Sequence, residues 1–319
     1  MNFQGLQKIE NADFYLDVAI KRMKKRIGEF RQEGMRGGQI NKSKAIELTK
    51  IESVEKELRD LLHTILISFP SIDSLPEFYR ELMSITLEIG LIKKSLGSIK
   101  WCIEKNRELL EKYRRNIRNS TEITRINQYR REFFGRLSST IKQIKKNLEY
   151  LEFARKEMKN YPAIKTGLPT VAIAGFPNVG KSTLLSRLTP AKPKIANYAF
   201  TTQGINIGYA EIKDQKIQFM DIPGTLARFE KQNMIERVAT LALKYVADAV
   251  IYVFDPTETY PVEKQIELYE LTKKSRKPVI IYLSKTDVAE KDKIEFFKNK
   301  YKAITNTEDL KKEIENLEF

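Results

Sequence analysis

The residues best suited to chemistry lie in one glycine-rich segment, which follows a short apolar run and precedes an amphipathic one. The segment consists of Gly175, Phe176, Pro177, Asn178, Val179, Gly180, Lys181, Ser182 and Thr183, in the pattern G-x-x-x-x-G-K-S. The backbone N–H groups of such a loop point at phosphate oxygens, and the N-terminus of the following helix adds positive potential. We expect Lys181 to contact the terminal phosphates and the Ser182 hydroxyl to bind Mg²⁺. The segment therefore predicts a site for a nucleoside triphosphate.

A second motif, Asp221-Ile-Pro-Gly224, closes a later apolar run. Its carboxylate can hold Mg²⁺, and its glycine N–H can sense the γ-phosphate. Between the two motifs, Thr201 and Thr202 lie in a polar stretch where a threonine would complete the coordination of Mg²⁺, and we favour Thr202. The alternative for both threonines is an ordinary turn before a strand. Ser182, Thr202 and Asp221 are therefore the predicted metal ligands.

The four residues that directly follow a strongly apolar run indicate which base the site binds. The stretch Ser284-Lys285-Thr286-Asp287 resembles the guanine-reading pattern Asn-Lys-x-Asp with serine in the first place. Asp287 can accept from both N1–H and the exocyclic amine of guanine, whereas adenine would leave the carboxylate unpaired. An unpaired buried acceptor costs about 1–3 kcal/mol, and more when it is charged. We therefore expect GTP and GDP as ligands, bound through Ser284, Lys285 and Asp287; a further base-contacting loop is only faintly indicated at 305–307.

Composition narrows the class of protein. Of 319 residues, 41% are hydrophobic and 31% are charged, as in globular proteins. No apolar run approaches the length of about 18 residues that spans a membrane, and the N-terminus lacks an export signal, so we expect a cytoplasmic protein without a membrane partner. With one cysteine, Cys102, and one histidine, His63, the chain cannot form an internal disulfide or a Cys/His zinc site, and we interpret both residues as packing material rather than as members of a catalytic pair.

The spacing of apolar residues divides the chain in two. Stripes at helical spacing run through 15–30, 48–69, 78–103 and 133–151, and turn residues lie between them. We expect about four helices, including one long helix from Phe78, in an antiparallel bundle that occupies residues 1–162.

The second part, residues 166–319, contains short β-branched runs between helical stretches, the pattern of a mostly parallel sheet with helices on both faces. The expected strands cover 170–174, 205–212, 217–222, 249–255 and 279–283. A weaker sixth strand is expected near 301–304, before a closing helix from Glu308. The predicted fold is thus a helical bundle followed by a P-loop GTPase domain.

Positive charge is concentrated in the first half of the chain. Residues 1–165 contain 34 basic and 22 acidic residues, a net charge of +12, whereas residues 166–319 carry only +3. The segment 112–146 holds eleven of these basic residues and two acidic ones. A rigid helical surface of arginines suits the shape and phosphates of A-form RNA, and a solvated basic face is the alternative. The candidate RNA-binding residues are Arg114, Arg115, Arg118, Arg125, Arg130 and Arg131.

Matches in both halves of the chain carry a family resemblance. They include Leu96-Gly-Ser-Ile-Lys-Trp101 and Gly135-Arg-Leu-Ser-Ser139 in the bundle, and Asn233-Met-Ile-Glu236 and Phe254-Asp-Pro256 in the second half. Together with the phosphate loop, these make the sequence resemble the nucleolar GTP-binding protein 1 family of Obg/HflX-like GTPases, in its short archaeal form. The resemblance implies a GTPase that docks on large ribosomal subunit precursors and assists their maturation, with its helical bundle on ribosomal RNA.

The resemblance also bears on turnover. The family's asparagine-containing loop suggests that Asn178 coordinates a K⁺ ion that supplements Lys181. Thr225 occupies the place where Ras-like GTPases carry a water-orienting glutamine, so we expect slow intrinsic hydrolysis, stimulated by K⁺ or by the ribosome. The residues predicted to act in hydrolysis are Lys181, Thr202, Gly224 and Asn178. We expect a monomer whose switch segments, 195–204 and 224–234, couple docking to nucleotide state.

Two other functions fit the same residues. Ser284, Thr225 and the weak 305–307 loop allow a scaffold that binds GTP and ribosomal RNA with little turnover. An Obg-like regulator on mature ribosomes is the other alternative. Multiple-turnover hydrolysis stimulated by ribosomal particles separates the scaffold from an assembly GTPase.

Overall fold

A computed structural model describes residues 3–32, 37–190, 194–196, 205–222, 234–258 and 260–319. By their internal contacts the residues form two compact units. The helical unit comprises 4–74 and 86–158, and the sheet unit comprises 1–3, 75–85 and 159–319. Within the described residues, no helix combines the length and the apolarity needed to cross a bilayer.

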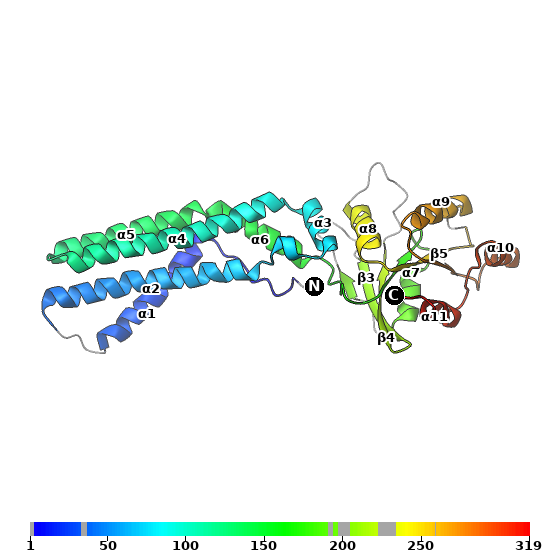
Figure 1. Ribbon diagram of the computed structural model, residues 1–319, viewed down its shortest axis with the longest axis horizontal. Coiled ribbons are helices and arrows are strands. Elements are labelled where there is room, and N and C mark those ends of the chain that lie inside the picture. The colour runs from blue at the N-terminus through cyan, green and yellow to red at the C-terminus, as the bar shows by residue number, and fades with distance from the viewer. Residues whose placement is uncertain (1–2, 33–36, 191–193, 197–204, 223–233, 259) are drawn as a thin grey trace. The chain divides into compact units, whose positions relative to one another are not determined.

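The helical unit is built on three long helices that pack against one another. Its elements are α1 (Ala12–Gln32), α2 (Gln39–Ser68), the 3₁₀ turn η1 (Ile72–Ser74), α4 (Ile89–Asn119), α5 (Ile123–Gln143) and α6 (Lys145–Lys159). Helices α2, α4 and α5 run side by side (Figure 1). The apolar stripe of α4 faces this core, where Asn106 and Thr140 form a buried hydrogen bond of 2.5 Å. The helical periodicity of the sequence is therefore confirmed as the buried face of the bundle.

The expectation of one long helix from Phe78 is wrong. A separate helix, α3 (Glu77–Thr86), ends before α4 begins, and the backbone between them is extended at Glu88. The hydroxyl of Tyr150 donates to the Glu88 carbonyl at 3.2 Å and accepts from the Glu88 N–H at 3.0 Å. The contact satisfies the Glu88 N–H, which a continuous helix would pair internally, whereas the Glu88 carbonyl also accepts from the N–H groups of Leu91 and Ile92 in α4. Because the stripe at 133–151 is also divided, at Ile144, the described residues up to 159 form six α-helices rather than about four.

Helix α3 packs with the sheet unit, although it lies within the first half of the sequence. The hydroxyl of Tyr79 accepts from the N–H of Ile164 at 2.9 Å and donates to the carbonyl of Pro162 at 2.7 Å. The ring of Phe3 packs edge-on against Tyr79 and Tyr161. These contacts tie α3 to the segment that leads into the first strand.

The sheet unit contains a six-stranded sheet that is mostly parallel. Its strands are β1 (Thr170–Ala174), β2 (Lys194–Ala196), β3 (Ile205–Ile212), β4 (Gln215–Asp221), β5 (Ala249–Phe254) and β6 (Val279–Leu283), in the order β2-β3-β4-β1-β5-β6. Strands β4, β1, β5 and β6 run parallel, and β3 is antiparallel to β4 and to β2. Positive φ values at Lys213 and Asp214 form the tight turn between β3 and β4. The predicted fold class is confirmed.

Helices of the sheet unit follow its strands (Figure 1). They are α7 (Lys181–Leu188), α8 (Met234–Tyr245), α9 (Val262–Lys273), α10 (Lys291–Tyr301) and α11 (Thr307–Glu315). The strand expected at 301–304 is wrong: α10 continues to Tyr301, Lys302 ends it in a left-handed conformation, and only Ile304 bridges to Tyr282. The sixth strand is instead β2, a three-residue edge strand too short to give a sequence pattern.

The carboxyl ends of the parallel strands place the chemistry-bearing residues on one edge of the sheet. Gly175 follows β1, Asp221 ends β4, Asp255 follows β5 and Ser284 follows β6. In open α/β sheets, ligands bind at this edge, where the connections to the helices diverge.

Candidate nucleotide-binding site

The phosphate loop, residues 175–183, joins β1 to α7 through three residues with positive φ. Gly175 and Gly180 have φ values of 145° and 95°, which favour glycine, and Asn178 has a φ of 61°. A Cβ atom at Gly175 would lie 2.6 Å from the carbonyl oxygen of Val253 on β5. The loop therefore turns tightly against the sheet, as a loop that wraps phosphate oxygens must.

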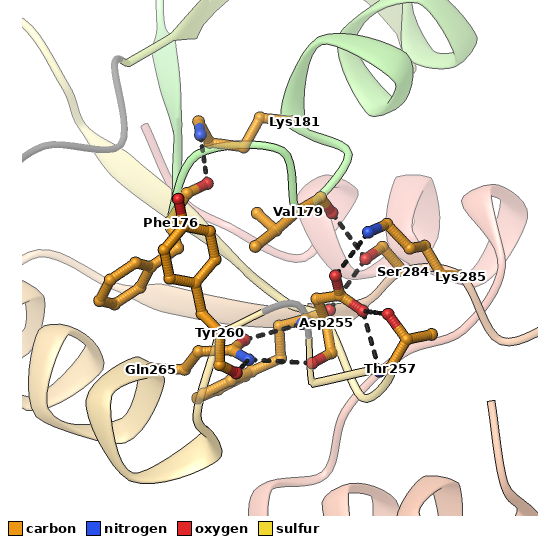
Figure 2. Close-up of polar contacts among 10 residues, drawn as sticks. Phe176, Val179, Lys181, Asp255, Thr257, Tyr260, Gln265, Ser284 and Lys285 are labelled. Atoms are coloured by element: carbon orange, nitrogen blue, oxygen red, sulfur yellow. Dashed lines mark hydrogen bonds and ion pairs between the residues drawn. The ribbon is translucent and has the colours of Figure 1, made fainter.

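Lys181 begins α7 with a charged side chain that is buried. The residue is 7% exposed, and its Nζ donates to the carbonyl oxygen of Phe176 at 2.7 Å (Figure 2). Burial lowers the pKa of the Lys181 ammonium, and the nearby Asp221 carboxylate opposes this shift. A desolvated ammonium gains free energy from an anion that replaces its lost hydration. The position of Lys181 therefore fits a phosphate group.

The side chains expected to hold Mg²⁺ are partly assembled. Ser182 Oγ donates to Asp221 Oδ2 at 2.5 Å, and Asn206 Nδ2 donates to the same oxygen at 3.1 Å. Mg²⁺ in nucleotide sites is usually held by one or two carboxylates, and water and phosphates supply further ligands. In the part of the chain that the structure describes, no group of three His, Cys, Asp or Glu side chains forms a metal site. The donor set thus fits a metal held jointly with a nucleotide.

Two predicted site residues, Thr202 and Gly224, lie outside the described residues, as does Thr225. The switch segments 195–204 and 224–234 lie largely outside them as well. The roles of these residues in metal binding and hydrolysis stay predictions.

A pocket of about 500 Å³ joins the phosphate loop to the segment expected to read the base. Its lining consists of Asn178, Gly180, Thr183, Leu184, Arg187, Tyr282, Leu283, Ser284, Lys285, Thr286, Asp287 and Thr305. The volume lies within the range of small-molecule sites. Asp287 is exposed, so its carboxylate is accessible to a molecule in the pocket. The phosphate loop and the predicted base-reading residues therefore share one concave site.

Ser284 links the two sides of this pocket. Its Oγ lies 2.6 Å from the carbonyl oxygen of Val179 and 3.0 Å from that of Phe254 (Figure 2). The backbone N–H of Ser284 already donates to the Phe254 carbonyl at 2.9 Å, so the single hydroxyl proton can serve Val179. The serine that replaces the usual asparagine thus still holds the phosphate loop against the end of β6.

Two pocket residues were weakly predicted or missed. Arg187 was not expected, although it lies four residues after Thr183 on α7, and residues four apart share a helix face. Thr305 was only faintly indicated. It reaches the pocket because the preceding residue pairs with β6: the N–H of Ile304 donates to Ile281 at 2.9 Å, and Leu283 donates to Ile304 at 2.8 Å.

The arginines predicted to bind RNA lie in the last part of α4 and the first part of α5, and they differ in what surrounds them. Arg114 Nε pairs with Glu52 at 2.9 Å and Arg130 Nε pairs with Glu47 at 3.0 Å, so these two guanidinium groups neutralise acids of α2. The exposed ones are Arg115, Arg118, Arg125 and Arg131, of which Arg125 pairs with Glu122 at 3.4 Å. The positive charge free to meet a polyanion is therefore smaller than the sequence suggests.

Comparison with known families gives the relationship of the whole chain. The family model of the NOG1 N-terminal helical domain matches residues 3–165, just over half of the chain. The chain belongs to the NOG1 family. A second model, described as a 50S ribosome-binding GTPase, matches residues 170–285. This NOG1 family member therefore carries a P-loop GTPase domain after its helical region.

Relatives of this NOG1 family member come from archaea and eukaryotes. An uncharacterised protein of Methanocaldococcus jannaschii is 35% identical over 296 residues, which cover 92% of this chain and 83% of that protein. The nucleolar GTP-binding protein 1 of Drosophila melanogaster is 28% identical over 292 residues, 90% of this chain and 44% of that protein. The chain thus spans less than half the length of the Drosophila relative.

Solved structures that resemble part of the chain include two of the protein Era. Era of Aquifex aeolicus bound to GDP and AlF₄⁻ is 28% identical and covers 46% of this chain and 56% of its own, with a TM-score of 0.37. Era in complex with MgGDPNP and a segment of 16S ribosomal RNA is 27% identical and covers 47% and 56%, also with a TM-score of 0.37.

Proposed function

We propose that the protein hydrolyses GTP and docks through its basic helical unit on large ribosomal subunit precursors, whose assembly it assists, with nucleotide state gating the docking. The observation that carries the nucleotide-dependent part is the pocket lined by Asn178, Gly180 and Thr183 of the phosphate loop together with Ser284 and Asp287. We further propose a cytoplasmic monomer with functional domains at 1–162 and 166–319.

Guanine selectivity is proposed to come from Asp287. Asp287 is exposed and belongs to the lining of the pocket, which also includes Asn178 and Gly180 of the phosphate loop. The carboxylate can accept hydrogen bonds from the two adjacent N–H donors of guanine, whereas adenine has no matching pair of donors. GTP and GDP are therefore the proposed ligands, with ATP bound more weakly.

Hydrolysis is proposed to depend on positive charge around the terminal phosphate. Lys181 supplies the buried ammonium, and Ser182, Asp221 and Thr202 would hold Mg²⁺. Bound Mg²⁺ would neutralise charge on the phosphates during transfer. Gly224 would sense the γ-phosphate, and Asn178, exposed in the loop, would hold K⁺. Because Thr225 cannot orient water as glutamine does, intrinsic turnover should be slow.

Docking on ribosomal RNA is proposed for the exposed arginines of α4 and α5. Arg115, Arg118, Arg125 and Arg131 extend into solvent from rigid helices. Phosphate contacts of this kind position a protein on RNA without reading its sequence. The description of the second family model as a 50S ribosome-binding GTPase supports the large subunit as the partner.

Hydrolysis is tested by multiple-turnover phosphate release. We expect slow release in Na⁺ and faster release when K⁺ or large-subunit precursors are added. Equal rates in Na⁺ and K⁺ would remove the proposed K⁺ site at Asn178. Tight GTP binding without stimulated turnover would favour a GTP-binding RNA scaffold instead.

Docking is tested by crosslinking the tagged protein in its own lysate, with a GTP analogue or with GDP, followed by sequencing of the attached RNA. We expect crosslinks from residues 112–146 to large-subunit RNA, stronger with the GTP analogue. Separating precursor from mature particles before the analysis tests the assembly role, because enrichment on mature ribosomes would favour an Obg-like regulator. If no crosslinks form in either nucleotide state, the proposed docking on RNA would be wrong and only the proposed binding of GTP would remain.

A further inference from the structure

Asp255 is a fully buried carboxylate (0% exposed) at the end of β5, beside the base-reading segment. Its Oδ2 accepts from Lys285 Nζ at 2.6 Å (Figure 2). Its Oδ1 accepts from the N–H of Thr257 at 2.9 Å and from the Thr257 hydroxyl at 2.6 Å. A charge removed from water is tolerated where a partner and hydrogen bonds offset its desolvation. Here the charged partner belongs to the predicted base-reading motif.

The backbone around Asp255 is held by α9. The N–H of Asp255 donates to Gln265 Oε1 at 2.9 Å, and Gln265 Nε2 donates to the carbonyl oxygens of Asp255 and Tyr260, each at 2.9 Å. The centroid of the Tyr260 ring lies 4.9 Å from the centroid of the Phe176 ring in the phosphate loop. Figure 2 shows this set of contacts between the phosphate loop and Lys285. The Asp255 carboxylate is therefore a fixed point to which Lys285 is attached.

Lys285 controls the turn that carries Asp287. Its backbone has a φ of 51°, a left-handed conformation that residues other than glycine rarely adopt. The N–H of Val288 donates back to the Lys285 carbonyl at 3.3 Å, which closes a turn containing Asp287. Lys285 thus forms the first position of the turn in which Asp287 lies.

We propose that Asp255 is a positioning residue for base recognition. Its ion pair with Lys285 holds the turn so that the Asp287 carboxylate meets the donor edge of guanine. Asp255 itself does not touch the nucleotide. The inference rests on the proposed binding of GTP and GDP in the pocket, and it assigns the selectivity of that site to a residue outside the base-reading motif.

The test is the substitution D255N, read through two nucleotides. Asparagine has the shape of aspartate and keeps an acceptor for Thr257, but it presents an uncharged amide to Lys285. Affinities for GDP and for IDP, which lacks the 2-amino group, are measured by displacement of a fluorescent GDP analogue. The wild-type protein should prefer GDP by roughly tenfold or more. In D255N the affinity for GDP should fall about tenfold, that for IDP should fall less, and the preference should shrink to about threefold or below.

Two further variants keep the test interpretable. T257A removes one hydrogen bond to Asp255 but leaves its pair with Lys285, so the preference for GDP over IDP should stay at the wild-type value. D255N/K285Q contains no unpaired buried charge, so it should fold even if D255N does not. If Asp255 acts through Lys285, this double variant and K285Q should show the same reduced preference.

Each outcome decides the inference. A D255N protein that loses affinity for GDP and IDP by the same factor would show that Asp255 supports only the fold, and the proposal would be wrong. A preference in K285Q that differs clearly from that in D255N/K285Q would also overturn it. Failure of the wild-type protein to bind GDP is a different result, because it would overturn the proposed function and this inference with it.

Discussion

The nucleotide pocket and the basic ends of α4 and α5 both depend on charged side chains, but these are held in different ways. In and beside the phosphate loop, Lys181 and Asp221 are buried and bonded to backbone or side-chain atoms of adjoining segments. On α4 and α5, Arg115 and Arg131 extend into solvent from helix surfaces. A short sequence motif predicts the first kind of site, because the backbone of the loop itself forms the site. A count of charges reports the second kind poorly, since acids from other helices neutralise part of it.

The comparison is tested most strongly at Lys181. K181A removes the buried ammonium, and we expect GTP hydrolysis to fall about 10²- to 10³-fold because charge on the terminal phosphate loses its main protein partner. The affinity of the nucleotide-free protein for RNA should not change. Phosphate release and RNA binding are measured in parallel, with K216A, an exposed lysine of the same unit, as the matched control. Wild-type turnover in K181A would contradict the assigned machinery.

A buried ionisable group in the helical unit offers a contrast to Lys181. Burial raises the pKa of the Cys102 thiol from 9.0 to about 11, partly opposed by hydrogen bonds from Thr140 and Asn106. The unfolded chain therefore loses this proton first, and the free energy of unfolding should fall as pH rises from about 9 to about 11, by about 2–3 kcal/mol.

The measurement for Cys102 is urea unfolding at a series of alkaline pH values. C102A should show a smaller decline over the same interval, because it has no thiol to ionise. Equal declines in the two proteins would mean that other groups, such as buried tyrosines, cause the alkaline sensitivity. In that case the ionisation of Cys102 would not contribute measurably to the loss of stability at alkaline pH.

The exposed arginines provide the next largest effect. R115A/R118A/R131A should weaken binding to ribosomal RNA by roughly tenfold or more, and should reduce the slope of log affinity against log salt by about 2. Salt-dependent RNA binding measures both. K21A/K24A/K25A removes the same charge from exposed positions of α1 and should have a smaller effect on the slope. Equal losses in the two triple variants would mean that RNA responds to net charge rather than to this surface.

A substitution at Ser284 tests whether this serine links the two sides of the pocket in place of the usual asparagine. S284A removes the hydroxyl that bridges to the Val179 carbonyl, and we expect GDP affinity to fall by about tenfold because a buried acceptor loses its donor. S284N supplies a new donor and should restore most of the loss. Titration with GDP checks both variants. An unchanged affinity in S284A would show that the link between the two sides of the pocket does not support binding.

The smallest effect is expected at the paired arginines. R114A/R130A leaves Glu52 and Glu47 without these partners, and we expect the free energy of unfolding to fall by about 1 kcal/mol, since the pairs are only partly buried. The salt slope of RNA binding should stay close to the wild-type value. A slope reduced as far as in the exposed triple variant would contradict the division between paired and exposed arginines.

The sequence by itself determined the elements whose cause is local. The runs at 170–174, 205–212 and 279–283 became β1, β3 and β6 with the expected bounds, because β-branched side chains in short apolar runs suit a buried strand. The phosphate loop could also be predicted from the sequence, because Gly175 and Gly180 adopt backbone conformations that other residues avoid.

Only the tertiary structure decided the features that depend on residues far apart in the chain. The break at Glu88 is stabilised by Tyr150, and the nearby Gly90 does not by itself predict it, because Gly90 lies within α4. The acids that neutralise Arg114 and Arg130 come from α2, and Lys285, which follows β6, pairs with Asp255, which follows β5. Such pairs form because folding brings distant segments together, and no local spacing of residues records which segments will meet.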